Sequence, residues 1–502
     1  MVVLERHIFR SKERGTFVFN PETGEYTEAS VDATLTLPKV VDRRKRELLI
    51  LDFGDAFFLD KFITIKKYDN VLNKLPFGNK DTLKAMISFY TLANLANVNA
   101  DDWYSGSYAS YLYPDARLDS RRISEFLKAL GREKNYRAFF PSHIDYVRRM
   151  VSGDEAVLID SSGLPNSVHF PLTAVSNHNG KINRELRIIA VVQKDTGMPL
   201  FFRYVPGNIV DVNTIVRTVH EMVALGVGMD YCILDAGYYN DLIFDQFAFA
   251  SIDFMTRVNS GHGIYKSLVD EHVKSLERKE NLVRYNGRML FVKKVSCKVG
   301  TDSNVQAYAY ICKDISRAFD ESEKLFRDTS DEDFDPQAVY DGMEIAGIFI
   351  ILTTRNIAIQ EILPAYYMRQ QIEQLFDIEK NYSHLVPARI HTEETLRGHL
   401  LLSFISSSLV KMLQMDLKKT EYNPINLFVN LRNQKCKVYN SQIVTAEPVK
   451  KVTDIYRKFH ITCPPKITYI DKFLSEDLRF VKSNSTKKRG RKKKGSNNED
   501  SK

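Results

Sequence analysis

The apolar residues of this chain change their spacing along the sequence. Between residues 80 and 150 they recur every three or four positions, as at Leu83, Met86, Ile87 and Tyr90, which predicts helices buried along one side. From residue 156 short apolar runs alternate with helical stretches. This order predicts a mixed α/β sheet flanked by helices. The expected strands are 157–159, 185–192, 200–205, 231–234 and 254–258, and the expected helices are 211–225 and 241–249.

Other segments precede, interrupt or follow this α/β pattern. Residues 1 to about 70 have the composition of short strands and turns. Residues 260–352 carry three more strand candidates around an acidic stretch, which predicts a mostly β insertion. The expected parts are a β-rich N-terminal region (1–75), a helical region that is a candidate for DNA binding (76–150), the first part of the α/β core (151–259), a β-rich insertion (260–352), the second part of the core (353–415), a C-terminal region (416–481) and a disordered basic tail (482–502).

The positive charge of the chain is concentrated near its C-terminal end. The formal net charge is +8, and residues 482–502 alone hold nine Lys and Arg against two acidic residues. Such a tail, with Lys487, Arg489 and Arg491 at its centre, is typical of a nonspecific arm for nucleic acid. The rest of the chain is close to neutral, so we expect it to bind a polyanion only through local patches.

Cysteine usage and hydropathy argue against two classes of protein. The five cysteines are scattered without a C-x-x-C pair, which disfavours a disulfide framework or a zinc knuckle and fits a reducing cytoplasm. The first residues are charged and lack the apolar stretch of a signal peptide. The most apolar run, 400–413, is interrupted by serines and Lys411 and is too short to span a bilayer. We therefore expect a buried core helix there and no membrane association.

Two arginines lie beside an apolar helix face in the N-terminal part. A helix that begins at Asp119 or Ser120 leaves Arg121 and Arg122 outside its apolar side. A small helical module with basic flanks is compatible with a DNA reader of the helix-turn-helix type. A helical bundle that packs on the next domain explains the same pattern.

The segment 366–380, YYMRQQIEQLFDIEK, carries the most specific charge pattern. It contains no Gly or Pro and is rich in good helix formers, so we expect one continuous helix. At about 100° per residue, Tyr366, Arg369, Glu373 and Lys380 fall on one stripe about 60° wide. One carboxylate between two cations and a phenol suits a face that handles phosphate and a metal ion, although an ordinary charged helix gives the same stripe.

Two short apolar strands each end in an aspartate, Asp160 and Asp235. If the strands are neighbours in one sheet, both carboxylates emerge at one edge, and Glu373 can approach from a helix packed nearby. Three carboxylates close together repel one another, and a divalent cation that prefers oxygen ligands, Mg²⁺ or Mn²⁺, relieves the repulsion. Aspartate after a strand is also common at ordinary turns, so these residues alone leave both interpretations open.

These motifs resemble those of the DDE transposases of bacterial insertion sequences, in the group whose catalytic helix carries Tyr-x2-Arg-x3-Glu-x6-Lys. Residues 366–380 keep every interval of that signature. The resemblance covers about 150–415. Its supporting segments stand in the expected order: VLIDSSG with Asp160, PGNIVDVNT at 206–214, ILDAGYYN with Asp235, and RGHLLLSFISSSL at 397–409.

The resemblance implies a ribonuclease H-like catalytic core with a β-rich insertion before the helix that carries the glutamate. It implies that Asp160, Asp235 and Glu373 are catalytic and hold two Mg²⁺ ions, for which Mn²⁺ can substitute. The implied activity is cleavage at transposon ends, followed by attack of the freed 3′ hydroxyl on target DNA. Two metal ions suit such an in-line phosphoryl transfer because they hold both the attacking and the leaving oxygen.

The same resemblance implies specific DNA contacts. Tyr366, Arg369 and Lys380 are expected to hold the transposon end. Some relatives stack a flipped base on a tryptophan of the insertion, but the single Trp of this chain lies in its N-terminal part. Tyr308 or Tyr310 is therefore the expected substitute.

The implied partners are double-stranded DNA, both terminal inverted repeats and target DNA, and a second copy of the chain in a homodimer on that DNA. The expected location is the bacterial cytoplasm, on the nucleoid when bound. Two alternatives remain open: a nuclease with the same core but no strand transfer, and a transposase-derived DNA-binding protein. The loss of an acid would have favoured the latter, and all three acids are present.

Overall fold

The computed structural model describes four short strands between residues 2 and 28 and most of residues 49–469. The stretches not described within 49–469 are 151–155, 166–169, 171, 179–180, 209–211, 330–334, 382–391, 419 and 440–441. The chain divides into two compact units. The smaller unit comprises residues 1–51, 435–447 and 464–502, and the larger unit comprises 52–434 and 448–463.

The smaller unit contains two four-stranded sheets among its described residues. The first is an antiparallel meander in sequence order. It consists of β1 (Val2–Glu5), β2 (Ile8–Ser11), β3 (Gly15–Phe19) and β4 (Tyr26–Glu28). The second has the order β18-β17-β16-β5. It consists of β5 (Leu49–Asp52), β16 (Lys435–Tyr439), β17 (Gln442–Thr445) and β18 (Ile467–Tyr469).

The larger unit is built on a mixed sheet of ten described strands. Their order is β12-β13-β14-β15-β11-β10-β6-β8-β7, and β9 pairs with β8. β10 is parallel to both β6 and β11, whereas β6, β8 and β9 run antiparallel, which confirms the mixed α/β sheet. The strands are β6 (Ala156–Pro165), β7 (Ala174–His178), β8 (Lys181–Gln193), β9 (Pro199–Pro206), β10 (Tyr231–Leu234), β11 (Asp253–Val258), β12 (Leu282–Tyr285), β13 (Arg288–Val299), β14 (Val305–Asp314) and β15 (Ile348–Thr353).

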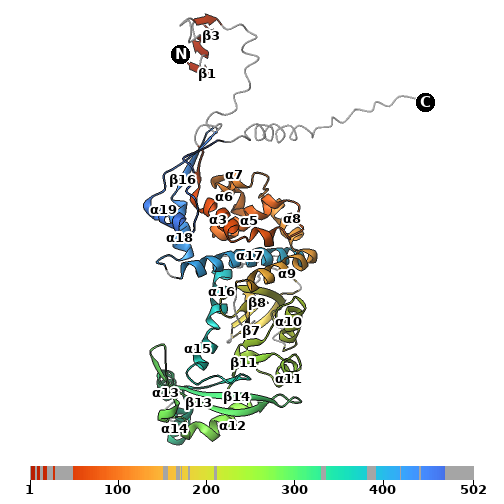
Figure 1. The fold of residues 1–502 in the computed structure, drawn as a ribbon, viewed down its shortest axis with the longest axis vertical. Helices are drawn as coiled ribbons and strands as arrows, with labels where there is room; N and C mark the ends of the chain where they lie inside the picture. The colour runs from red at the N-terminus through yellow and green to blue at the C-terminus, as the bar shows by residue number, and fades with distance from the viewer. Residues whose placement is uncertain are drawn as a thin grey trace, which may run out of the picture. The chain divides into compact units, whose positions relative to one another are not determined.

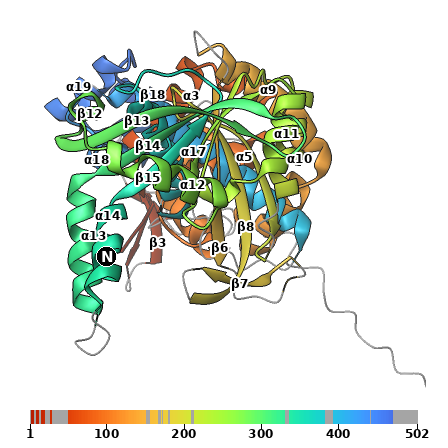
Figure 2. The same cartoon turned by 90° about the horizontal axis from the view of Figure 1, so that it is seen from below.

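The segment expected to be a mostly β insertion contains substantial helix as well. Its strands β12, β13 and β14 extend the same sheet beyond β15, and α12 (Gly263–His272), α13 (Ile315–Asp328) and α14 (Pro336–Ile345) accompany them. Figure 2 shows α13 and α14 side by side. The acidic residues favour these helices because Asp314 and Asp335 accept backbone N–H groups at the two N-termini.

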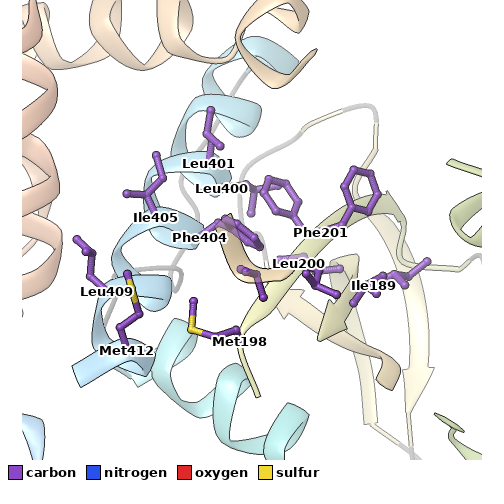
Figure 3. Packing of buried hydrophobic residues seen from close by; sticks show 14 of the residues in the cluster. Ile189, Met198, Leu200, Phe201, Leu400, Leu401, Phe404, Ile405, Leu409 and Met412 are labelled. Carbon is purple, nitrogen blue, oxygen red and sulfur yellow. The ribbon is translucent and has the colours of Figure 1, made fainter. Parts of the chain in front are cut away.

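Helix α17 (Glu393–Leu417) is the core helix of the larger unit. In Figure 1 it runs between the N-terminal helices on one side and strand β8 on the other. By length and composition it could cross a membrane, but 83% of its most apolar window is buried inside the protein, as expected for a core helix. Figure 3 shows Leu400 and Phe404 of α17 pointing toward Leu200 and Phe201 of β9.

The N-terminal part of the larger unit is helical from residue 54 onward. The expectation of strands and turns up to about residue 70 was therefore wrong for α3 and α4. Most of α3 is buried, and its polar side is limited to Asp60, Lys61 and Thr64, so the helical pattern is weak in the sequence. The helices are α3 (Gly54–Ile65), α4 (Asp69–Leu72), α5 (Lys80–Leu92), α6 (Ala100–Gly106), α7 (Ala109–Leu112), α8 (Ser120–Leu130) and α9 (Glu133–Arg148), and α18 (Pro424–Arg432) and α19 (Lys450–Lys458) follow α17.

Helix α8 crosses α17 at a pair of glycines. A Cβ on Gly398 would lie 1.9 Å from the Leu127 carbonyl oxygen, and a Cβ on Gly131 would lie 1.8 Å from that of Glu394. Only glycine allows the two backbones to approach so closely. The helices of this region therefore form a bundle packed on the core, which is the second of the two interpretations considered for them.

The two faces of the sheet bury different apolar clusters. Leu158 and Ile233 belong to the cluster formed with α15 (Ile362–Tyr367) and α16 (Gln370–Asn381). Val157 belongs to the larger cluster, which also contains residues of α10 (Val212–Ala224) and α11 (Asp241–Phe249). Because side chains alternate along a strand, the even-numbered positions in the first half of β6, up to Asp160, face α15 and α16.

Candidate active site

Asp160 and Asp235 lie where the pairing of two neighbouring parallel strands ends. β10 stops at Leu234, just before Asp235, whereas β6 continues past Asp160 to Pro165, so the expected end of that strand at Asp160 was wrong. β6 and β10 pair with Ile159 opposite Leu234, so the two aspartates follow at adjacent positions. Asp160 comes two residues after Leu158 and therefore lies on the face covered by α15 and α16. The expected condition, that the two strands be neighbours in one sheet, is met.

The helix expected over residues 366–380 is interrupted. α15 ends at Tyr367 and α16 begins at Gln370. At the interruption the N–H groups of Arg369 and Ile372 donate to carbonyls three residues back, at 3.2 and 3.0 Å, instead of four. The prediction of one continuous helix is therefore wrong, although Arg369 still lies between Tyr366 and Glu373, 3.4 Å from the tyrosine hydroxyl and 3.7 Å from Glu373 Oε1.

Arg369, in the turn between α15 and α16, contacts all three acids. Its Nη2 lies 2.9 Å from Asp160 Oδ2 and 3.7 Å from Glu373 Oε1, and its Nη1 lies 2.7 Å from Asp235 Oδ1. The exposed fraction of the side chain is 12% for Asp160, 38% for Asp235 and 59% for Glu373. Acids from two strands and a helix thus converge on one guanidinium, and Asp160 is the buried member.

Burial and charge act in opposite directions on this cluster. Burial raises the pKa of Asp160 above its usual value, the guanidinium of Arg369 opposes that rise, and the charge of Asp235 adds to it. Burial lowers the pKa of Arg369, but the charges of Asp160 and Asp235 outweigh this effect, so the pKa lies above its usual value. The Ser161 N–H also donates to Asp160 Oδ1 at 2.7 Å. Arg369 therefore stays charged and holds the negative cluster together.

The donor set fits a hard divalent cation. Three carboxylates bound to one guanidinium carry a formal charge of −2, and oxygen ligands suit Mg²⁺ or Mn²⁺. In this arrangement the acids surround the guanidinium, and the described part of the chain contains no group of three or more His, Cys, Asp or Glu that could itself hold a metal ion. Asp160, Asp235 and Glu373 would hold the ions, and Arg369 would have to withdraw from between them.

The other expected residues of the signature differ in their surroundings. Tyr366 is buried, and its hydroxyl lies 3.4 Å from Arg369 Nη1. It is therefore placed to support Arg369 and is covered from solvent. Lys380 belongs to α16, but its side chain lies outside the described residues.

The arginines of α8 lie on the surface. Arg121 Nε is 3.2 Å and Arg122 Nη1 is 2.9 Å from carboxylate oxygens of Glu125. Exposed pairs within one helix are weak, so both side chains can exchange this partner for a phosphate. The other expected contacts lie outside the described residues: Lys487, Arg489 and Arg491.

Of the two tyrosines expected to replace the tryptophan of relatives, only Tyr308 has access to solvent. Tyr310 is fully buried, and its hydroxyl bonds to the backbone of Ile357. Tyr308 is half-buried, with Lys294 Nζ 4.6 Å from its ring centre. The expectation is therefore wrong for Tyr310 and stays a prediction for Tyr308.

Two charged residues near the site were missed by reasoning from the sequence. Glu185 and Arg187 stand two positions apart in the otherwise apolar strand β8, and both are buried. Charged residues in a buried strand are rare unless they are paired, so their position in an apolar run was the signal that could have identified them. Arg187 donates to Ser161, the residue after Asp160.

Comparison with known proteins agrees with this site. A family model described as a transposase DDE domain matches residues 152–409, which include all three acids. No curated protein matches the chain. A solved synaptic complex of piggyBac transposase with hairpin DNA is similar over 81% of this chain and 77% of that chain, at 11% identity and a TM-score of 0.38, a value too low to support an argument. Because the family model spans more than half of the sequence, the chain belongs to the family of proteins with a transposase DDE domain.

Proposed function

We propose that the protein is a DNA transposase that cuts transposon ends and joins the 3′ hydroxyl to target DNA by two-metal phosphoryl transfer. The observation that carries this proposal is the convergence of Asp160, Asp235 and Glu373 on one guanidinium. We assign the ribonuclease H-like core to strands β9-β8-β6-β10-β11, because the two aspartates lie where the pairing of the central strands β6 and β10 ends.

We assign the three acids different roles as metal ligands according to their positions. Asp160, buried and fixed by the Ser161 N–H, is the shared ligand, and Asp235 and Glu373 each complete one ion. The bound Mg²⁺ or Mn²⁺ ions would supply Lewis-acid stabilisation of the attacking and leaving oxygens. Arg369 lies beside the same carboxylates and is placed to pair with a phosphate of the DNA end.

We also propose the partners and the location that the resemblance implies. The substrates are double-stranded DNA with terminal inverted repeats and a target duplex, and two copies of the chain act together as a homodimer on the DNA. Arg121, Arg122 and the basic tail at 482–502 add electrostatic contacts to the DNA backbone. We place the protein in the bacterial cytoplasm, on the nucleoid.

The test is cleavage of DNA taken from both flanks of the coding region, in the presence of Mg²⁺. Wild-type protein should nick this DNA at a terminal repeat, and Asp160→Asn and Glu373→Gln should each lose at least about a thousandfold in rate. Asp377→Asn is the matched control because Asp377 is exposed on the same helix, one turn after Glu373. Equal activity of the Asp160→Asn and wild-type proteins would refute the proposal.

The same reactions separate the proposal from its alternatives. A transposase should also join the cut 3′ end to a supercoiled plasmid. Cleavage without joining would indicate a nuclease, and DNA binding without metal uptake would indicate a DNA-binding protein derived from a transposase.

A further inference from the structure

A buried charged pair lies beside the motif that carries Asp160. Glu185 and Arg187 of β8 are each 5% exposed, and Arg187 Nη2 lies 3.9 Å from Glu185 Oε1. Buried ion pairs are a poor source of stability because desolvation offsets the attraction. Two apolar side chains would serve this strand at least as well, so the pair calls for another explanation.

Two glycines from different motifs make room for this pair. A Cβ on Gly163, in VLIDSSG, would lie 2.4 Å from Glu185 Oε2, and a Cβ on Gly207, in PGNIVDVNT, would lie 2.2 Å from the Glu185 carbonyl oxygen. Gly163 stands directly opposite Arg187 across the β6–β8 ladder. Both segments therefore fit around Glu185 and Arg187, although they are far apart in the sequence.

The pair reaches Asp160 through Ser161. Arg187 Nη1 donates to Ser161 Oγ at 3.3 Å, and the Ser161 N–H donates to Asp160 Oδ1 at 2.7 Å. Tyr238, in ILDAGYYN, is buried nearby: burial raises the pKa of its hydroxyl, and the neighbouring Ser161 side chain opposes that rise. Two motif segments and strand β8 thus meet at Ser161, the residue whose backbone holds the buried acid.

We infer that Arg187 is a positioning residue, which fixes Ser161 and thereby the orientation of the Asp160 carboxylate toward its metal ions. This inference rests on the proposed function. Ser161 and Asp160 are adjacent and point to opposite faces of β6, so a clamp on Ser161 from one face sets the carboxylate on the other. Residues that orient metal ligands in this way typically change metal affinity or activity by about 10–100-fold when they are removed.

The test compares variants of the full-length protein by calorimetric titration with Mn²⁺ in the absence of DNA. Arg187→Met should bind Mn²⁺ about 10–100-fold more weakly than wild type, and Arg187→Lys should recover part of the loss. Arg203→Met is the matched control, because it breaks an ion pair of the adjacent strand β9 with Glu221 and should leave Mn²⁺ affinity unchanged. Equal affinities for Arg187→Met and Arg203→Met would overturn the inference.

Two further measurements keep the result decisive. In single-turnover cleavage, Arg187→Met should lower the rate and leave the Kd for DNA within about twofold of wild type, because the residue is buried away from the DNA. If Arg187→Met does not fold, the Mn²⁺ affinity of Ser161→Ala is measured instead. It should be weaker than that of wild type, and an unchanged affinity would overturn the inference. A wild type that binds Mn²⁺ but cuts no DNA would refute the proposed function and leave the calorimetric comparison valid, whereas a wild type that binds no Mn²⁺ would overturn both.

Discussion

The contact between Arg369 and Asp160 allows a quantitative test of how the acidic cluster is held together. Replacing Arg369 with Gln leaves Asp160 buried without its counterion. Removal of one partner from a buried ion pair costs about 3–5 kcal/mol, while the more exposed Asp235 and Glu373 add little. Because 12% of the Asp160 side chain is still exposed, we expect the free energy of unfolding to fall by about 2–4 kcal/mol in EDTA at pH 7.

A double-mutant cycle isolates that contribution. Asp160→Asn removes the charge, so Arg369→Gln should cost far less in that background, with a coupling energy of at least about 1.5 kcal/mol. The assay is equilibrium unfolding in urea, followed by far-ultraviolet circular dichroism. The exposed pair of Arg149 and Asp145 is the control cycle, and its coupling energy should be at most about 1 kcal/mol.

The same variants test whether a divalent cation can replace the guanidinium. Mn²⁺ should raise the unfolding free energy of Arg369→Gln more than that of wild type, because the variant has no competing internal cation. A coupling energy below about 0.5 kcal/mol for Arg369 and Asp160, or equal stabilisation of both proteins by Mn²⁺, would refute this account of the cluster.

Four other predictions address packing, protonation and DNA binding. Gly398→Ala should lower the free energy of unfolding by at least about 2 kcal/mol, because a backbone carbonyl blocks the new methyl group. The control is Gly106→Ala, which has open space around the new methyl group and should not destabilise the protein. Thermal unfolding of both variants checks this. Burial lowers the pKa of His143 to about 4. As pH drops from about 6.5 to 4, the unfolded chain therefore takes up a proton before the folded protein does, and the free energy of unfolding should fall. In urea unfolding, His143→Gln should show a weaker dependence of this free energy on pH. Burial lowers the pKa of Lys411 to about 8, so stability should rise as pH increases from about 8 to 10.5, and Lys411→Met should remove that rise in the same measurement. Deletion of 482–502 should weaken DNA binding chiefly at low salt and leave sequence preference intact in a binding titration, and a loss of preference would contradict an electrostatic role.

Local patterns predicted much of the fold because the relevant interactions are local or periodic. The strand at 231–234 and the helix at 241–249 have the expected bounds, since each combines a short apolar run with a clear start signal. Proximity of Asp160 and Asp235 followed from one topological condition, that their strands be neighbours. Patterning failed at α3, because most of this helix is buried and its polar side is limited to Asp60, Lys61 and Thr64.

In the insertion, the role of an acidic side chain depends on the backbone around it and cannot be predicted from composition. The segment was expected to be mostly β around its acidic stretch, yet Asp314 and Asp335 cap two helices. Glu321 accepts the N–H of Gly347 across the turn that leads into β15. The same residue types serve as caps, turn partners or solvent-exposed charges, and only the surrounding backbone decides among these roles.

The interruption between α15 and α16 depends on interactions that no local pattern contains. Residues 366–380 are good helix formers without Gly or Pro, so propensity alone favours a continuous helix. At the interruption, hydrogen bonds to carbonyls three residues back replace regular helical ones at Arg369 and Ile372. Their geometry is poorer, so the cost is at most about 0.5–1.5 kcal/mol for each bond. In return Arg369 reaches Asp160 and Asp235, acids from two distant strands, and leaving Asp160 buried without a partner would cost about 3–5 kcal/mol. The tertiary ion pairs therefore outweigh the poorer local hydrogen-bond geometry, and they hold the guanidinium at the point where the three acids meet.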